Sequence, residues 1–136
     1  MVHALTEAQR SLKPNGILID LRPSPKRRQV GLGMGKNWKS LGAMRETFED
    51  DYASNLAVKQ VIKPGLFTLE STTTFELDRV MDTLDDFRKM LSDFSAERLA
   101  NHQWLIDRIE KVQKKTRSRK KIVVRGPMVL NVLKKA

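Results

Sequence analysis

The stretch that most constrains the fold of this chain runs from Ala4 to Pro23 (ALTEAQRSLKPNGILIDLRP). Between Leu5 and Leu12, apolar residues recur at helical spacing and predict an amphipathic helix. Pro14-Asn15-Gly16 ends that helix, because proline cannot continue the hydrogen-bond ladder and Asn-Gly tolerates a positive φ. The almost wholly apolar run Ile17–Leu21 predicts a short strand covered on both faces. Helix, turn and buried strand together form half of an α/β unit.

The same residues carry a resemblance. The helix, the turn Leu12-Lys13-Pro14-Asn15-Gly16 and the strand Ile17–Asp20 resemble the late motif of class I S-adenosylmethionine-dependent methyltransferases. In that family, a helix ending in an L-K-P-G-G-like turn leads into the fifth strand, and an antiparallel hairpin follows. The strand-like segments 66–76 and 122–133 supply such a hairpin, with the last strand inserted antiparallel beside the fifth. The resemblance covers nearly the whole chain, but only as the C-terminal half of the family's fold.

The resemblance also implies what this chain lacks. In the family, the methyl donor lies on a glycine-rich loop after the first strand, an acidic residue ending the second strand and a region at the fourth. All of these precede the matched helix, and no stretch within residues 1–136 replaces them. We therefore expect no catalytic activity from this chain alone and no cofactor in it. S-adenosylmethionine enters only if an upstream half exists, and the role left to this half is a substrate-side or assembly role.

Without the family's neighbouring strand, the strand at 17–21 has an unpaired edge beside exposed apolar surface. Proteins cover such edges, most often by two-fold self-association. We therefore expect a homodimer.

Composition sets the broad class of the protein. At 136 residues, with 40% hydrophobic and 31% charged residues, the chain is predicted to form a single globular domain over 1–136. The absence of cysteine excludes disulfides and thiolate zinc sites and fits a cytoplasmic protein. No apolar run approaches the roughly 18 residues of a membrane span. The net charge of +10 favours contact with nucleic acid, an anionic membrane face or an acidic protein.

Two short strands are predicted at 29–34 and 38–44, with Gly35-Lys36-Asn37 as the hairpin turn between them. The pattern Gly31-x-Gly33-x-Gly35 has the spacing of a nucleotide-binding loop. That loop, however, needs a hydrophobic strand before it and a helix N-terminus after it. Here a proline-rich basic segment precedes the glycines and a strand-like segment follows, so we interpret them as small residues in a twisted hairpin.

Four helices are predicted, at about 4–12, 50–62, 78–94 and 96–115, the last with Ser95 as its N-cap. With strands at 66–75 and 122–133, the last bent at Gly126-Pro127, they predict an α/β fold. In practice this is α+β: a partial methyltransferase-like, mainly antiparallel sheet with helices packed against it. The expected inward-facing side chains of the last three helices are Tyr52, Leu56 and Val61 or Ile62; Val80 or Met81, Leu84, Phe87, Leu91 and Phe94; and Leu105, Ile109 and Val112.

Catalytic groupings are sparse in this sequence. His3 and His102 are the only histidines, neither has a partner at i+4, and both are expected at the surface or a helix edge. No serine stands in a G-x-S-x-G elbow. Asp82, Asp85 and Asp86 are expected on a solvated helix face. The sequence thus assigns no catalytic residue and no metal ligand.

The basic run at 114–121 is the strongest binding signal. Lysine and arginine neutralise phosphates and give salt-sensitive affinity with little sequence information. No aromatic residue follows Trp104, however, whereas single-strand binders interleave aromatics that stack on bases. Two interpretations stay open: a solvated loop, or a basic adaptor that binds nucleic acid or an acidic partner. The candidate contact residues are Lys26, Arg27, Arg28, Lys114, Lys115, Arg117, Arg119, Lys120 and Lys121.

Overall fold

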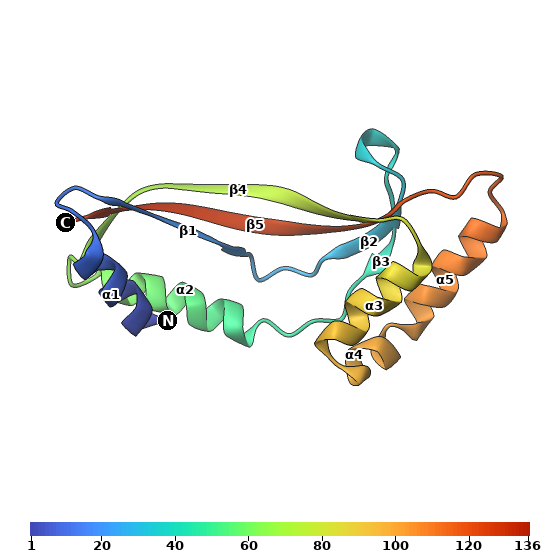
Figure 1. Ribbon diagram of the computed structural model, residues 1–136, viewed down its shortest axis with the longest axis horizontal. Helices are drawn as coiled ribbons and strands as arrows, with labels where there is room; N and C mark the ends of the chain where they lie inside the picture. The colour runs from blue at the N-terminus through green and yellow to red at the C-terminus, as the bar shows by residue number, and fades with distance from the viewer. The chain divides into compact units, whose positions relative to one another are not determined.

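The computed structural model describes residues 1–136 and contains helices together with one antiparallel sheet of five strands (Figure 1), so the predicted α+β class is confirmed. The elements in chain order are α1 (Val2–Ser11), β1 (Ile17–Pro23), β2 (Gln29–Leu32), the 3-10 turn η1 (Gly35–Asn37), β3 (Lys39–Ala43), α2 (Glu49–Ile62), β4 (Phe67–Met81), α3 (Leu84–Phe94), α4 (Ala96–Asn101), α5 (Gln103–Lys114) and β5 (Ile122–Lys135).

The chain divides into two compact units, each assembled from segments distant in sequence. Unit 1 comprises Met1–Lys26, Thr47–Glu76 and Pro127–Ala136, and unit 2 comprises Arg27–Glu46 and Leu77–Gly126. The long strands β4 and β5 contribute to both units, and each unit has its own hydrophobic core.

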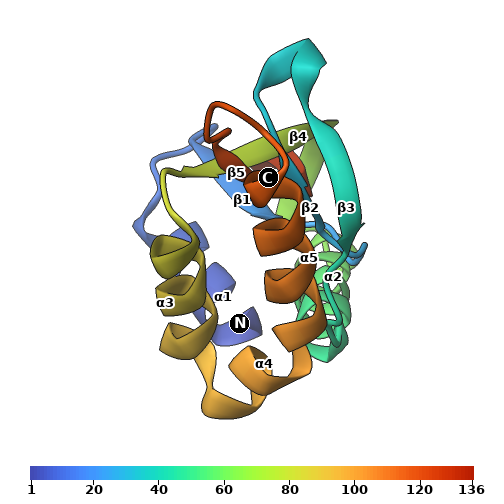
Figure 2. The same ribbon diagram turned by 90° about the vertical axis from the view of Figure 1, so that its right-hand side faces the viewer.

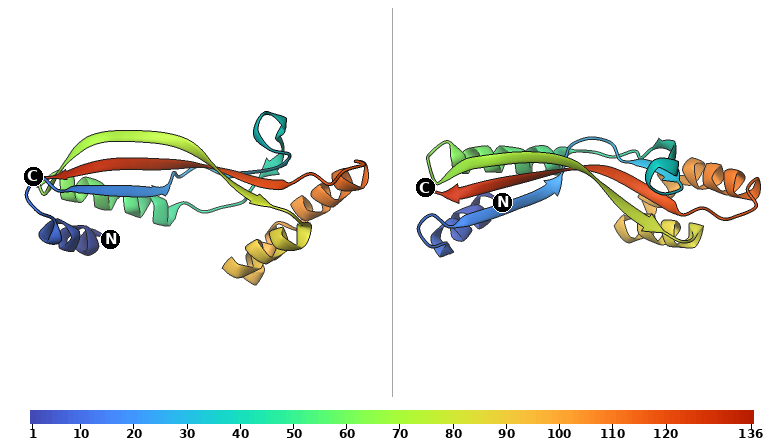
Figure 3. Two further views of the ribbon diagram at one scale, coloured as in Figure 1. Left: turned by 45° about the horizontal axis from the view of Figure 1, so that its top comes forward. Right: turned by 90° about the horizontal axis from the view of Figure 1, so that it is seen from above.

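In unit 1, β5 pairs with β4 on one side and with β1 on the other. The β1–β5 pairing is antiparallel and unbroken, from Ile17 opposite Lys134 to Pro23 opposite Met128. Helices α1 and α2 lie on the same face of these strands (Figures 1 and 3). The predicted helix, turn and strand are confirmed, with Asn15 at φ 61° in the turn. The buried core residues are Leu5, Ala57, Val58, Val61, Phe67 and Leu133.

Strand β1 is covered on one face only. Leu18 and Asp20 point toward the helices, whereas Ile17, Ile19 and Leu21 are 52–57% exposed on the other face. The prediction of a strand covered on both faces was therefore wrong. An apolar run shows that a strand fits a core, but it does not show that a second layer of structure is present to cover it.

Helix α2 also presents a different face from the one predicted. Tyr52 and Leu56 are 60% and 56% exposed, while Ala57 and Val58 are buried one position further along the helix. Val61 is buried as predicted. Apolar residues line more than one side of α2, so helical spacing alone did not identify the side that packs.

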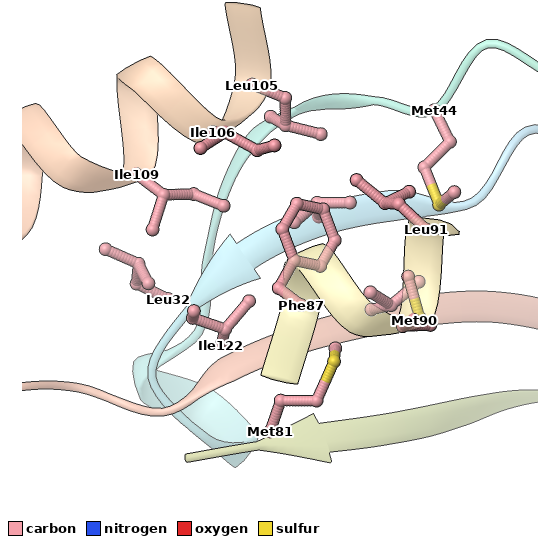
Figure 4. Close-up of a cluster of buried hydrophobic side chains, with 12 residues drawn as sticks. Leu32, Met44, Met81, Phe87, Met90, Leu91, Leu105, Ile106, Ile109 and Ile122 are labelled. Carbon is pink, nitrogen blue, oxygen red and sulfur yellow. The ribbon is translucent and has the colours of Figure 1, made fainter. Parts of the chain in front are cut away.

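In unit 2, β2 pairs antiparallel with both β3 and β5. Helices α3, α4 and α5 complete this unit (Figure 2), and Figure 4 shows Phe87 of α3 among apolar side chains from α5 and the strands. The predicted hairpin at 29–44 is confirmed, with η1 between its strands. The buried core residues are Val30, Leu32, Met44, Met81, Phe87, Met90, Leu91, Leu105, Ile106, Ile109, Ile122 and Val124.

The glycines of this hairpin are explained by close packing and turn geometry. A Cβ atom at Gly31 would lie 2.6 Å from the Trp38 ring, which donates its indole N–H to the carbonyl of Val123. Gly33 and Gly35 adopt positive φ values of 95° and 54°, which L side chains rarely adopt. The interpretation as hairpin glycines is therefore confirmed.

Two helix boundaries differ from the prediction. The helix expected from residue 78 begins at Leu84, because β4 continues to the buried Met81 and Thr83 then forms a capping box with Asp86. The helix expected over 96–115 is interrupted at His102, so five α-helices are present instead of four. Phe94, expected to face inward, is 56% exposed.

No helix has the length and apolar composition needed to cross a membrane.

Candidate functional site

No group of three or more His, Asp or Glu side chains is placed to hold a metal ion. A pocket of about 350 Å³ opens in unit 2 between the start of α3 and the end of α5. Acidic side chains, including Asp82 and Glu110, line it together with Lys114 and Arg119. Asp82 is already bound by Lys121, and no histidine or aromatic ring lines the pocket, so we assign it no chemistry.

The best-defined interaction feature of unit 1 is the outer edge of β1. The amide of Lys135 donates to the carbonyl of Gly16 at 2.8 Å, and the amide of Ser24 donates to the carbonyl of Pro127 at 2.9 Å. These bonds fix the even-numbered residues of β1 as those that hydrogen-bond to β5, because bonded and non-bonded pairs alternate in an antiparallel ladder. The N–H and C=O groups of Ile17, Ile19 and Leu21 therefore point outward, away from β5.

No other strand pairs with this edge, since β1 ends the strand order of the sheet. The residues with outward backbone groups are also those whose side chains are more than half exposed. Their direct partners on β5 include Val132 opposite Ile19 and Leu130 opposite Leu21, both partly exposed. We call this surface of β1 and β5 the open face; the right-hand view of Figure 3 looks onto the strands from the side away from α1 and α2.

The opposite face of β1 carries a buried polar network. The Asp20 carboxylate accepts hydrogen bonds from Arg22 Nε at 2.7 Å and Nη2 at 2.9 Å, and from Asn131 Nδ2 at 2.8 Å. Arg22 Nη1 donates to Asn55 of α2 at 2.8 Å, and Thr72 of β4 donates to Asn131 at 2.9 Å. The network joins three strands and a helix, and sequence analysis missed it because its members are far apart in the chain.

The predicted basic loop is confirmed as a loop between α5 and β5, and its cations are exposed. Lys114 lies 3.9 Å from Glu110, and Lys121 is paired with Asp82. The side chains of the remaining four candidates form no hydrogen bond or ion pair with a carboxylate. These are Lys115, Arg117, Arg119 and Lys120.

The second predicted cluster, Lys26 to Arg28, is split by the structure. Lys26 and Arg27 are exposed, whereas Arg28 donates to the Glu46 carboxylate through its backbone N–H at 3.0 Å and its Nε at 2.8 Å. Arg28 is thus held inside unit 2, and it is not a free anion contact. No hydrogen bond or ion pair connects Arg27 or Arg28 with the basic loop.

Glu46 is the centre of a charged cluster. Its side chain is 10% exposed, and it also lies 3.4 Å from Arg98 of α4. Burial alone would raise the pKa of the Glu46 carboxyl, but the hydrogen bonds and charge of Arg28 and the charge of Arg98 outweigh burial and lower that pKa. Burial and the like charge of Arg28 lower the pKa of Arg98, against the opposing effect of Glu46. One carboxylate therefore balances two guanidinium groups.

His102 belongs to the same region. It was predicted at the surface or a helix edge, and it lies at the α4–α5 junction but is not exposed. It is fully buried; its Nε2 accepts a hydrogen bond from the backbone N–H of Arg45 at 3.0 Å, and its Nδ1 lies 2.7 Å from the carbonyl of Arg98. The side chain ties the α4–α5 junction to the segment after β3, which accounts for its burial without a catalytic role. His3 is exposed, as predicted.

No known family model, curated protein or solved structure matches this chain.

Proposed function

We propose that this chain is the C-terminal half of a class I methyltransferase-like sheet, without methyl-donor binding of its own, and that it acts through assembly at the β1 edge. Support comes from the order of elements: α1, a Lys-Pro-Asn-Gly turn, β1, and a final strand β5 lying antiparallel beside β1 with β4 on its far side. The resemblance implies this arrangement for the last strands of the family.

The assembly role rests on one observation, the unpaired outer edge of β1 beside exposed Ile17, Ile19 and Leu21. Exposed strand edges next to apolar surface recruit further strands. A homodimer meets this requirement.

The lack of donor binding is tested by titrating S-adenosylmethionine into the 136-residue chain in a calorimeter. We expect no binding heat, because the residues that hold the donor in the family precede the part that this chain resembles. Circular dichroism of the same sample shows whether the chain is folded. Saturable binding in the micromolar range would contradict the proposal.

A second candidate function is a basic adaptor for nucleic acid, favoured by the four exposed loop cations without carboxylate partners. We expect the chain to bind duplex DNA or RNA at about 50 mM salt and to lose affinity steeply as salt rises. In a plot of the logarithm of the binding constant against the logarithm of salt concentration, the slope becomes shallower when fewer phosphates are neutralised. Replacing Lys115, Arg117, Arg119 and Lys120 with glutamine should reduce this slope by about 0.9 for each DNA phosphate that the loop no longer neutralises.

The matched control replaces four exposed lysines outside the loop, which are Lys36, Lys39, Lys59 and Lys63, with glutamine. Both variants change the net charge equally. An equal fall in affinity in the two would show attraction by net charge alone, and no binding at low salt would remove this candidate.

A further inference from the structure

We propose that the partner of the β1 edge is β1 of a second copy of this chain, paired antiparallel about a two-fold axis at Ile19. The inference rests on the assembly role proposed above and gives that role a partner and a register. It requires no donor-binding half and no activity.

The outward backbone groups specify a β-strand as the occupant. Ile17, Ile19 and Leu21 present N–H and C=O groups that the β1–β5 ladder leaves outside. In an antiparallel pair about Ile19, Ile19 faces Ile19 of the second copy and Ile17 faces its Leu21. All three residues then exchange both backbone hydrogen bonds, so the edge becomes a continuous ladder.

The open-face side chains of β1 lack the features that usually prevent such pairing, because its two charged residues, Asp20 and Arg22, are paired with each other on the helix-covered face. Natural edges carry charges, prolines or bulges. The register of β1 with β5 contains no bulge, and the only proline, Pro23, is its last residue. By contrast, the part of β4 that forms the other edge of unit 1 bears the exposed charges of Glu70 and Glu76. Pairing through β1 therefore closes as a dimer and does not continue through β4.

The side chains of β1 match a second copy in the register centred on Ile19. Its cross-strand pairs on the open face are all aliphatic, so each pair buries apolar surface and brings no like charges together. Asp20 then lies opposite Leu18 on the helix-covered face, and its carboxylate already has its hydrogen bonds within its own chain. A register centred on Asp20 would instead place two carboxylates directly opposite each other, which is destabilising.

Charge predicts how the dimer responds to salt. Each copy carries a net charge of +10, so the two copies repel each other. Screening reduces that repulsion, and the dimer should therefore strengthen as salt rises from about 0.05 M to 0.5 M. Nucleic-acid binding by the basic loop would change in the opposite direction.

The first test is sedimentation velocity on the full chain at both salt concentrations. We expect a species of about twice the 15.6 kDa of one chain, favoured at high salt. Ile19→Lys should weaken it roughly tenfold or more, because two lysines then face each other in place of two isoleucines. The matched control is Leu77→Lys on β4, at 53% exposure against 54% for Ile19, which should leave the dimer unchanged.

The second test uses the absence of cysteine. In the proposed register, the two Ile19 Cα atoms lie about 5.5 Å apart, within the range that a disulfide bridges. Ile19→Cys should therefore form a cross-linked dimer on mild oxidation. Leu21→Cys should not, because the two copies of residue 21 are about 13 Å apart, four residues along the strand.

A monomer at both salt concentrations, or a dimer that Ile19→Lys leaves intact, would overturn this inference. Cross-linking through Leu21→Cys but not Ile19→Cys would overturn the register. A monomer that also binds no S-adenosylmethionine would leave the methyltransferase-like half standing and exclude only the second copy as its partner. A dimer that also binds S-adenosylmethionine would keep the second copy as the partner of β1 and would contradict the proposal that this chain lacks methyl-donor binding.

Discussion

Replacing Asp20 with alanine should lower the free energy of unfolding of unit 1 by about 4 kcal/mol. Asp20 is 8% exposed, and its carboxylate receives three hydrogen bonds from Arg22 and Asn131. The Arg22 side chain is 13% exposed, so removing the carboxylate leaves a largely buried guanidinium without its counter-charge. Breaking a buried pair from one side is far more costly than losing an exposed pair.

The measurement is urea unfolding followed by far-UV circular dichroism, because Trp38 and Trp104 both lie in unit 2 and their fluorescence does not report on unit 1. Asp20→Ala combined with Arg22→Ala should cost less than the sum of the single changes, since the two side chains interact directly. The control is Glu7→Ala, which removes an exposed pair with Arg10 and should cost under about 0.5 kcal/mol. A loss below about 1 kcal/mol for Asp20→Ala would show that the network is not stabilising.

Local signals explain which parts of the fold the sequence predicts well. Proline and glycine act on neighbouring residues only, so the Pro14-Asn15-Gly16 turn and the end of the predicted helix at residue 62, just before Pro64-Gly65, were placed correctly. The capping of α4 by Ser95, which accepts a hydrogen bond from the amide of Arg98 at 3.0 Å, is equally local. These features need no knowledge of the tertiary structure.

Features that depend on distant residues were missed. The open face of β1 depends on whether another layer packs there, and β4, which pairs with β5, continues to Met81 in the core of unit 2. Nearly all side chains of β4 are exposed. Its sequence beyond Phe75 therefore shows no clear alternation of apolar and polar residues that would predict a strand. The end of this strand therefore depends on tertiary contacts, which a single sequence does not display.

The candidate site shows the same division. The exposed loop at 114–121 follows from its charge density, because so many like charges cannot be buried together. Arg27 and Arg28 are adjacent in the same basic cluster, so the sequence does not distinguish them. Only in the structure does Arg28 donate a hydrogen bond to Glu46 from the other end of the β2–β3 hairpin. His102 is buried because two backbone partners, from the segment after β3 and from α4, satisfy both ring nitrogens.

Replacing Glu46 with glutamine should lower the free energy of unfolding of unit 2 by about 3 kcal/mol at neutral pH and by much less in acid. The folded state lowers the pKa of Glu46, since Arg28 and Arg98 outweigh the effect of burial. A depressed carboxyl pKa contributes stability above the unfolded value of about 4.3, and the contribution is lost as pH falls through the folded pKa. The wild type should therefore approach the variant below about pH 4.

Urea unfolding followed by tryptophan fluorescence at pH 7 and in acid measures this effect in unit 2, where both indoles lie. The control is Glu110→Gln in the same unit, whose exposed pair with Lys114 at 3.9 Å should change stability by under about 0.5 kcal/mol at either pH. Some acid dependence should persist in Glu46→Gln, because the hydrogen bond from Arg125 also lowers the pKa of Asp78. The same stability difference between wild type and Glu46→Gln at pH 7 and in acid would contradict the prediction, because it would show that the negative charge of Glu46 does not stabilise the cluster.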